Sequence, residues 1–191
     1  MYEGSARTGS QRPGDNIVGM PRLFLVGFMG AGKSSVGADL ADRLGYDFVD
    51  LDEEITKRFG APIREVFSDR GEPAFRAAES EELQRLAGLD GVVVATGGGA
   101  FCSQSNREII HGESGVSVFL DVPWHELRKR LAGDHAGRPM YDDAQQAKSL
   151  FGERLPHYRR AMIRVALEGT ETPTEVSELV LDALQEAACG I

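Results

Sequence analysis

The chain has 191 residues, a formal net charge of −9 at neutral pH, 41% hydrophobic residues and two cysteines. A chain of this length buries roughly 70% of the surface that it exposes when unfolded, so its core needs no disulfide or metal support, and we expect one soluble globular domain. The acidic charge opposes broad nucleic-acid binding, and the absence of any apolar stretch near ~20 residues excludes a transmembrane helix.

The elements follow a regular order along the chain. Residues 1–21 are rich in glycine, serine and polar side chains, and we expect a disordered tail there. Over 22–188, short apolar runs alternate with helical patterns, which predicts a three-layer α/β domain with a five-stranded parallel sheet. The strands are expected at 23–26, 47–50, 92–95, 116–120 and 163–167. The helices are expected at about 34–44, 52–60, 62–69, 73–87, 105–111, 123–132, 144–161 and 174–188.

The last of these helices has the clearest start signals. Thr172 fits the N-cap, Pro173 the first helical position, and Glu175 completes a capping box. Apolar residues then recur at helical spacing, so we expect this helix to pack one apolar stripe on the sheet.

A phosphate-binding loop follows the first predicted strand. The segment Gly27–Ser34 reads G-F-M-G-A-G-K-S and matches G-x-x-x-x-G-K-[ST] between a strand and a helix. Its small residues let successive backbone N–H groups converge on phosphate oxygens at the positive end of the next helix. We expect Lys33 to bridge the β- and γ-phosphates and the Ser34 hydroxyl to ligate Mg²⁺. The nucleotide contacts expected here are Gly30, Ala31, Gly32, Lys33, Ser34 and Ser35.

Two carboxylates follow the second predicted strand. Asp50 and Asp52 are two residues apart, so in an extended chain both side chains point to one side. Ligands of open parallel sheets gather at the carboxyl ends of the strands, where this pair lies. One carboxylate can hold Mg²⁺ through water while the other accepts the proton of an acceptor hydroxyl. A helix cap is the alternative interpretation.

A glycine triplet, Gly97, Gly98 and Gly99, ends the third predicted strand. Three glycines leave backbone N–H groups open to a ligand that any side chain would block. Because they also cost considerable backbone entropy, a ligand contact is favoured over a flexible turn.

Several arginines are candidate anion-binding residues. Arg76 has Glu79 three residues later on the same helix face, where the carboxylate can fix the guanidinium, although a surface ion pair is the alternative. Arg138 lies in a glycine- and proline-rich stretch that resembles a mobile lid, at about 133–145. For Arg76, Arg138 and Arg154, the local sequence is also compatible with a charged side chain that is exposed to solvent and binds no ligand.

Taken together, these motifs resemble the shikimate kinase family in order and spacing across about 22–188. The resemblance implies a P-loop kinase fold related to nucleoside monophosphate kinases, with a mobile lid. It also implies transfer of the γ-phosphate of ATP to the 3-hydroxyl of shikimate in aromatic amino-acid biosynthesis. The segments that carry it are Phe24–Ser34, Phe48–Asp52, Gly71–Arg76, Thr96–Gly99, Arg138–Pro139 and Arg154–Tyr158.

The resemblance also implies roles on the acceptor side. Asp52 holds the hydroxyls of shikimate and is the candidate general base. Arg76 and Arg154 grip its carboxylate, whose two oxygens match forked guanidinium donors. Glu79 supports Arg76, and the glycine triplet lies near the substrate.

On the nucleotide side, the resemblance implies that Asp50 contacts Mg²⁺ through water. Arg138 closes with the lid, contacts ATP and neutralises the transferring phosphoryl group, a catalytic role shared with Lys33 and Asp52. Arg130 and Pro173 are expected to flank adenine.

Other functions stay open. Another small-molecule or nucleotide kinase of this fold, such as a gluconate kinase, shares the phosphate loop. A nucleotide-binding switch that reads guanine usually carries N-K-x-D, but Asn16 and Asn106 are the only asparagines and neither precedes lysine. An inactive relative is the third alternative. We expect a cytoplasmic monomer with Cys102 and Cys189 as free thiols.

Overall fold

The computed structural model describes residues 22–133 and 144–189. The predicted tail at 1–21 and most of the predicted lid, including Arg138, lie outside the described residues. At the centre is a five-stranded sheet in the order β2-β3-β1-β4-β5, and all its neighbouring strands run parallel. The strands are β1 (Arg22–Val26), β2 (Asp47–Asp50), β3 (Val92–Ala95), β4 (Gly115–Asp121) and β5 (Ile163–Ala166).

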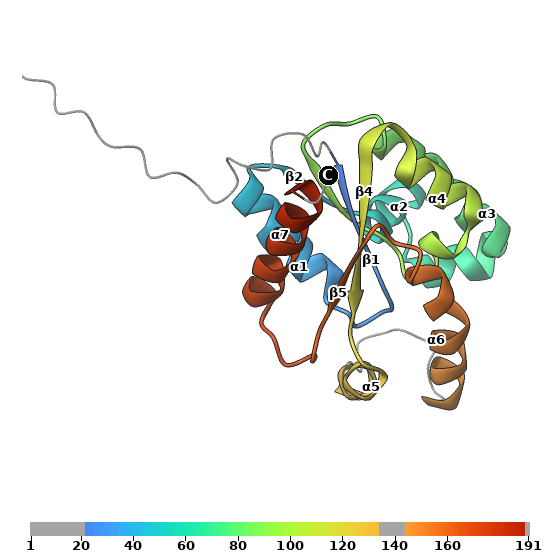
Figure 1. Ribbon diagram of the computed structural model, residues 1–191. Helices are drawn as coiled ribbons and strands as arrows, with labels where there is room; N and C mark the ends of the chain where they lie inside the picture. Colours follow the sequence, from blue (N-terminus) through green and yellow to red (C-terminus); the bar gives the residue numbers. More distant parts are fainter. Residues whose placement is uncertain (1–21, 134–143, 190–191) are drawn as a thin grey trace, which may run out of the picture.

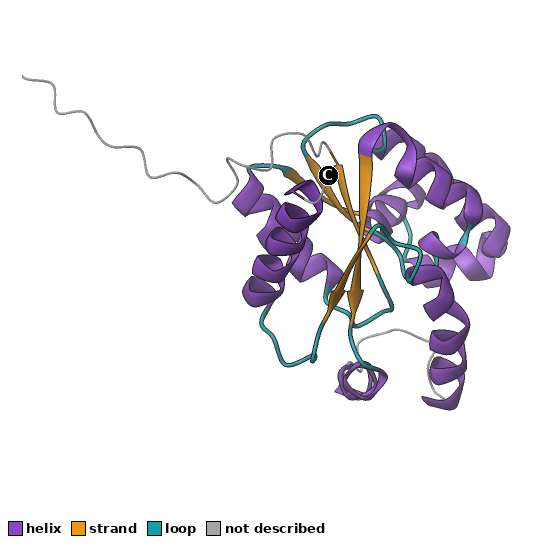
Figure 2. Ribbon diagram, viewed as in Figure 1, coloured by secondary structure: helices purple, strands orange, loops and turns teal. Residues whose placement is uncertain are grey.

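Helices cover both faces of the sheet, as Figures 1 and 2 show. On one face α1 packs against α7 and the sheet; on the other, α4 contacts β4 and α3, which in turn contacts α2. The central strands β1 and β3 are fully buried because both of their faces are covered, which explains their continuous apolar sequence. The helices are α1 (Lys33–Leu44), α2 (Leu51–Phe59), α3 (Ile63–Leu86), α4 (Gln104–His111), α5 (Trp124–Gly133), α6 (Ala144–Tyr158) and α7 (Pro173–Cys189).

The predicted parallel sheet and its strand positions are confirmed to within a residue or two. The predicted start of α7 is also confirmed, since Thr172 N donates to Glu175 Oε2 at 2.7 Å and Glu175 N donates to Thr172 Oγ1 at 3.3 Å. No helix within 22–133 and 144–189 is both long and apolar enough to span a membrane.

The helices predicted at 62–69 and 73–87 are confirmed as the two parts of α3, because Gly71 between them has a non-helical φ of 79° and ψ of 164° that produces a kink. Glycine tolerates this conformation, and Pro73 fits just after the kink as the start of a new helical turn. The helix expected at 144–161 ends at Tyr158, where tighter turns bring the chain into β5.

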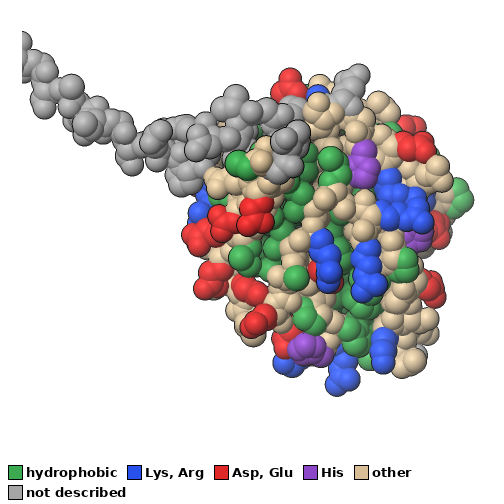
Figure 3. Space-filling view, in the orientation of Figure 1, with side chains coloured by type: hydrophobic (Ala, Val, Ile, Leu, Met, Phe, Trp, Pro, Cys, Tyr) green, Lys and Arg blue, Asp and Glu red, His purple; other side chains and the backbone are tan. Residues whose placement is uncertain are grey.

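Charged side chains are unevenly distributed over the face shown in Figure 3. Acidic side chains gather on the left, over α1 and α7, whereas a cluster of basic side chains lies on the right, near α4 and the end of α6. Although the net charge of the chain is −9, the surface near α4 and the end of α6 is therefore locally positive.

The contact between α1 and β2 gives a test of the packing. A Cβ atom at Gly37 would lie 2.6 Å from Phe48 Cε2, so Gly37→Val is expected to lower the free energy of unfolding by about 1–3 kcal/mol through overpacking. At Gly152 in α6, a Cβ atom would meet nothing within 4 Å. Gly152→Ala is therefore expected to raise the same quantity by roughly 0.5–1 kcal/mol. Urea unfolding measures the free energy of unfolding of both variants. Similar changes in this free energy at Gly37 and Gly152 would contradict the close contact between Gly37 and Phe48.

Candidate functional site

The phosphate loop connects β1 to α1. Gly30 and Gly32 have φ values of 75° and 90°, a left-handed conformation that glycine adopts without strain. Gly32 is the N-cap of α1, so the loop places backbone N–H groups at the positive end of that helix. This arrangement binds anionic phosphate groups.

Lys33 lies across this loop. Its Nζ donates to the carbonyl oxygens of Gly27 and Phe28 at 2.9 and 3.0 Å. The first residue of α1 thus holds its ammonium group against the phosphate loop, while its contact with the β- and γ-phosphates stays a prediction.

Ser34 and Asp50 face each other across the neighbouring part of the site. Ser34 Oγ donates to Asp50 Oδ2 at 2.5 Å, while Asp50 Oδ1 accepts from the N–H groups of Asp52 and Glu53 at 3.0 and 3.4 Å. Asp50 is therefore the N-cap of α2, which confirms the alternative interpretation of its sequence position, and it is also the hydrogen-bond partner of Ser34, while its contact with Mg²⁺ stays a prediction. A hydroxyl and a carboxylate oxygen this close are a ligand set of the kind Mg²⁺ prefers.

On the opposite side of the site, Arg130 connects the phosphate loop to the segment between β5 and α7 by hydrogen bonds. The Arg130 guanidinium donates to Gly30 O and to Gly169 O, both at 2.8 Å. Glu171 Oε1 and Oε2 accept the N–H groups of Glu168 and Gly169, both at 2.7 Å. Burial acts to raise the pKa of Glu171, but these backbone donors outweigh it and lower the pKa.

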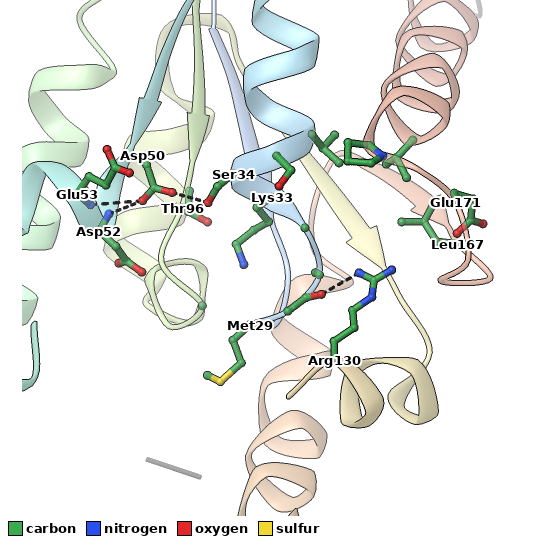
Figure 4. Close-up of a pocket in the computed structure, with 18 of the residues that line it drawn as sticks. Met29, Lys33, Ser34, Asp50, Asp52, Glu53, Thr96, Arg130, Leu167 and Glu171 are labelled. Atoms are coloured by element: carbon green, nitrogen blue, oxygen red, sulfur yellow. Dashed lines mark hydrogen bonds between the residues drawn. The ribbon is translucent and has the colours of Figure 1, made fainter. Parts of the chain in front are cut away.

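These residues surround a cavity of about 840 Å³. Figure 4 shows Asp50, Asp52 and Thr96 on one side, Leu167 and Glu171 on the other, and Lys33 between them. The lining also includes Ala31, Ser35, Gly98, Arg130, Pro173 and Val176.

Beside this cavity, charged side chains pack closely on the glycine triplet. A Cβ atom at Gly97 would lie 2.7 Å from Asp52 Oδ1 and 3.2 Å from Glu79 Oε1, and one at Gly99 would lie 2.8 Å from Arg76 Nη1. At Gly98 the nearest atom would be Arg154 Nη1, 3.4 Å away. Residues from α2, α3 and α6 therefore meet at the end of β3.

Arg76 is held by two carboxylates. Its Nη1 donates to both oxygens of Glu79 at 3.1 and 3.0 Å, and its Nε and Nη2 donate to Glu72 Oε1, both at 3.2 Å. Burial alone would lower the pKa of Arg76, but the attraction of Glu79 and Glu72 outweighs it and raises the pKa. The guanidinium is thus charged and oriented before any ligand arrives.

Glu79 and Cys102 are affected by burial. Glu79 is only 1% exposed, and burial raises its pKa above the ordinary 4.5, although Arg76 opposes the change. Burial also raises the pKa of the Cys102 thiol, more than nearby arginines lower it. A protonated thiol is a poor nucleophile, which agrees with the prediction that Cys102 is an unreactive free cysteine.

The site residues predicted from the sequence fall into two adjoining groups. The phosphate-loop residues, Asp50, Asp52, Gly98, Arg130 and Pro173 line the cavity. Arg76, Glu79, Arg154 and the rest of the glycine triplet lie against one another beside it. Arg138 is outside the described residues.

Sequence reasoning missed some residues that shape the site. Tyr158 OH donates to Gly98 O at 2.5 Å, and Thr96 Oγ1 donates to Leu25 O at 2.9 Å. Both residues belong to segments that carried the family resemblance, so a role could have been suspected. Glu171 had no such signal, because its partners are backbone groups of a turn that the sequence does not specify.

The fold and the site define a class of protein. A parallel five-stranded sheet leads from its first strand into a phosphate loop, with a carboxylate pair and two arginines at the ends of neighbouring strands. This is the arrangement of a P-loop kinase for a small anionic acceptor.

Comparisons with known proteins identify the particular family. A family model described as "SKI: Shikimate kinase" matches residues 29–185. A shikimate kinase of Persephonella marina is 37% identical over 161 residues, which cover 84% of this chain and 98% of that protein. A structure of shikimate kinase from Acinetobacter baumannii in complex with shikimate has a TM-score of 0.79 at 32% identity and covers 90% of this chain and 94% of that chain. The chain belongs to the shikimate kinase family.

A more distant likeness concerns one of the alternatives. A gluconokinase from Sinorhizobium meliloti has a TM-score of 0.57 at 24% identity and covers 90% of this chain and 95% of that chain. At this identity the likeness shows the shared fold alone. The P-loop kinase fold predicted from the sequence is confirmed.

The buried carboxylate predicts a pH dependence of stability. Because the pKa of Glu79 is higher in the folded state than its ordinary 4.5, the folded protein holds this proton more tightly than the unfolded chain. The contribution of Glu79 to the free energy of unfolding should therefore be largest at low pH and fall as pH rises through the folded-state pKa. Urea unfolding between about pH 4 and 7 should show this decline in the parent protein relative to Glu79→Gln. A stability difference that instead grows with pH would contradict the raised pKa.

Proposed function

We propose that the protein catalyses the reaction of its family, the ATP-dependent phosphorylation of the 3-hydroxyl of shikimate to shikimate 3-phosphate. This step belongs to the chorismate pathway of aromatic amino-acid biosynthesis. The observation that carries the proposal is the second group of residues, in which Asp52, Arg76 and Arg154 surround the glycine triplet beside the phosphate loop. Shikimate has a carboxylate and hydroxyl groups, which suit two guanidiniums and a carboxylate.

Asp52 is the candidate general base. Its carboxylate lies against Gly97 and lines the cavity that contains the phosphate loop. From this position it can accept hydrogen bonds from the hydroxyls of shikimate and take the proton of the attacking one. Loss of that proton makes the oxygen a better nucleophile toward the γ-phosphorus.

Arg76 and Arg154 bind the carboxylate of shikimate. Both guanidiniums lie against the glycine triplet, and Glu79 fixes the direction of Arg76. Two positioned cations neutralise the negative charge of the ligand carboxylate. The N–H groups of the glycine triplet lie close enough to add contacts.

The phosphate loop binds ATP. Lys33 leaves its carbonyl partners to contact the β- and γ-phosphates, while Arg130 and Pro173 border adenine. The Ser34–Asp50 pair fits Mg²⁺, with Ser34 as a direct ligand and Asp50 acting through water. When bound, this ion neutralises charge on the phosphate oxygens.

The other candidate functions have weaker support. A gluconate kinase shares the fold, yet the match to the shikimate kinase family covers residues 29–185 and includes the Arg76 and Arg154 segments. No observation favours a guanine-reading switch. We propose a monomeric enzyme of the cytoplasm with no nucleic-acid or membrane partner, on the basis of its acidic charge and its unpaired cysteines.

The direct test is ADP release from Mg·ATP with shikimate as acceptor, alongside gluconate, AMP, CMP and a control without acceptor. Turnover only with shikimate is the expected result. Turnover with another acceptor would overturn the assigned roles of Asp52, Arg76 and Arg154, whereas ATP binding without turnover would indicate an inactive relative.

Arg76→Ala tests the carboxylate site. Removing one of two cations should raise KM for shikimate by about 100-fold, because the carboxylate loses a charge-assisted contact. KM for ATP should stay nearly constant, since Arg76 does not line the ATP cavity. Arg85→Ala, on the exposed side of the same helix, is the matched control. Unchanged shikimate kinetics in Arg76→Ala would refute the assignment.

Asp52→Asn tests the general base. The amide keeps the shape of the carboxylate but cannot accept the proton, so kcat should fall by about 10²–10⁴-fold. Steady-state kinetics at saturating substrates measures this loss, with Asp42→Asn at the exposed end of α1 as control. A kcat within a few fold of the parent would exclude a proton-accepting role for Asp52.

A further inference from the structure

The carbonyl groups of the segment after β3 are held by side chains from two helices. Gly98 O accepts from Tyr158 of α6, and Ala100 O accepts from Asn106 Nδ2 of α4 at 3.0 Å. Arg107, also on α4, donates through Nη1 to the carbonyls of Phe101 and Cys102, both at 2.8 Å. The glycine triplet is therefore followed by a fixed turn, although it is itself a flexible sequence.

Asn106 has a special place among these contacts because it uses both ends of its side chain. Its Nδ2 donates to Ala100 O, and its Oδ1 accepts from Ser80 Oγ at 2.7 Å. Asn106 is 1% exposed and its bond to Ala100 O is buried, so water cannot easily replace that bond. The carbonyl of Ala100 can only accept a hydrogen bond, so the NH₂ end of the amide must face it. The amide oxygen then faces the Ser80 hydroxyl, which donates.

Ser80 connects this amide to the arginine of the acceptor site. It lies on α3 directly after Glu79, whose carboxylate holds Arg76. The Ser80–Asn106–Ala100 bridge therefore joins the helix that carries Arg76 to the turn that follows the glycine triplet. Arg76 lies close to Gly99, since a Cβ atom added at Gly99 would lie 2.8 Å from Arg76 Nη1, and a side chain there would require the guanidinium to shift.

We propose that Asn106, together with Ser80, is a positioning residue for the acceptor: the bridge sets the spacing between the glycine triplet and Arg76, and hence the affinity for the substrate carboxylate. Neither side chain touches substrate in this role. The inference rests on the proposed function, because it concerns how that same site binds shikimate. A shift well under an ångström between two contact groups is enough to weaken a charge-assisted pair of fixed geometry.

The test compares variants that break either half of the bridge. Asn106→Leu keeps the branched shape of the side chain, although leucine is larger, and removes both bonds; Asn106→Asp keeps the acceptor for Ser80 while facing Ala100 O with a carboxylate. Both are expected to raise KM for shikimate by about tenfold, with KM for ATP changed less than about twofold. Ser80→Ala should raise KM for shikimate by a smaller factor, and Ser80→Thr, which retains the hydroxyl, should restore the parent value.

A double variant separates the bridge from two independent effects. Ser80→Ala combined with Asn106→Leu should raise KM for shikimate no more than Asn106→Leu alone, because the hydroxyl has already lost its partner. Ser105→Ala is the matched control, since Ser105 is exposed and, among the described residues, its hydroxyl pairs with the N-cap hydroxyl of Ser103 and not with Ser80 or Ala100. It should leave both KM values unchanged.

The result that would overturn the inference is a lower thermal midpoint with KM for shikimate unchanged, or an equal rise in both KM values. If Asn106→Leu fails to fold, Ser80→Ala and Ser80→Thr still decide the question, because Ser80 is only half-buried. Absence of shikimate turnover in the parent protein would instead refute the proposed function, so the two failures are distinguishable.

Discussion

The organisation of the site depends on the absence of side chains at the glycine triplet. Charged groups from α2 and α3 approach the backbone there to distances that a Cβ atom would not permit without a shift, namely Asp52 at Gly97 and Arg76 at Gly99. The backbone flexibility of three glycines opposes folding. Side chains of α4 and α6 offset it by holding the neighbouring carbonyls. The triplet is thus at once a place of close approach and a rigid element.

Acidic and basic side chains face one another around the triplet. Asp52 and Glu79 lie against Gly97, and Arg76 and Arg154 lie against Gly99 and Gly98. Burial penalises Glu79, as its raised pKa shows, yet Arg76 reduces that penalty. The exposed Glu72 occupies the Nε side of the same guanidinium. The direction of Arg76 is therefore already set, which in the proposed function lowers the entropy lost when it binds a carboxylate.

Local patterns were sufficient to predict the parts of the molecule whose chemistry is local. The phosphate loop is a contiguous motif, and the α7 capping box lies within four residues, so both could be read from the sequence. By contrast, Arg130 holds Gly30, which lies 100 positions earlier in the chain, and Asn106 holds Ser80 across two helices. Such partners follow from packing, which a single sequence does not contain. The break within α3, in contrast, was predictable, because Gly71 and Pro73 are local helix-breaking signals and Gly71 has a non-helical φ of 79°.

The order of the strands explains why one fold can bring two substrates together. β1 leads into the phosphate loop and β3 into the glycine triplet, and these strands are neighbours with Leu25 opposite Ala95. Thr96 extends the pairing by donating both its N–H and its hydroxyl to Leu25 O, at 3.1 and 2.9 Å. The two loops therefore start from a common, fully buried base. Phosphoryl transfer requires acceptor and donor to be held nearly in contact and in line. A rigid sheet edge with two glycine-rich loops side by side meets this requirement better than loops joined only through mobile segments.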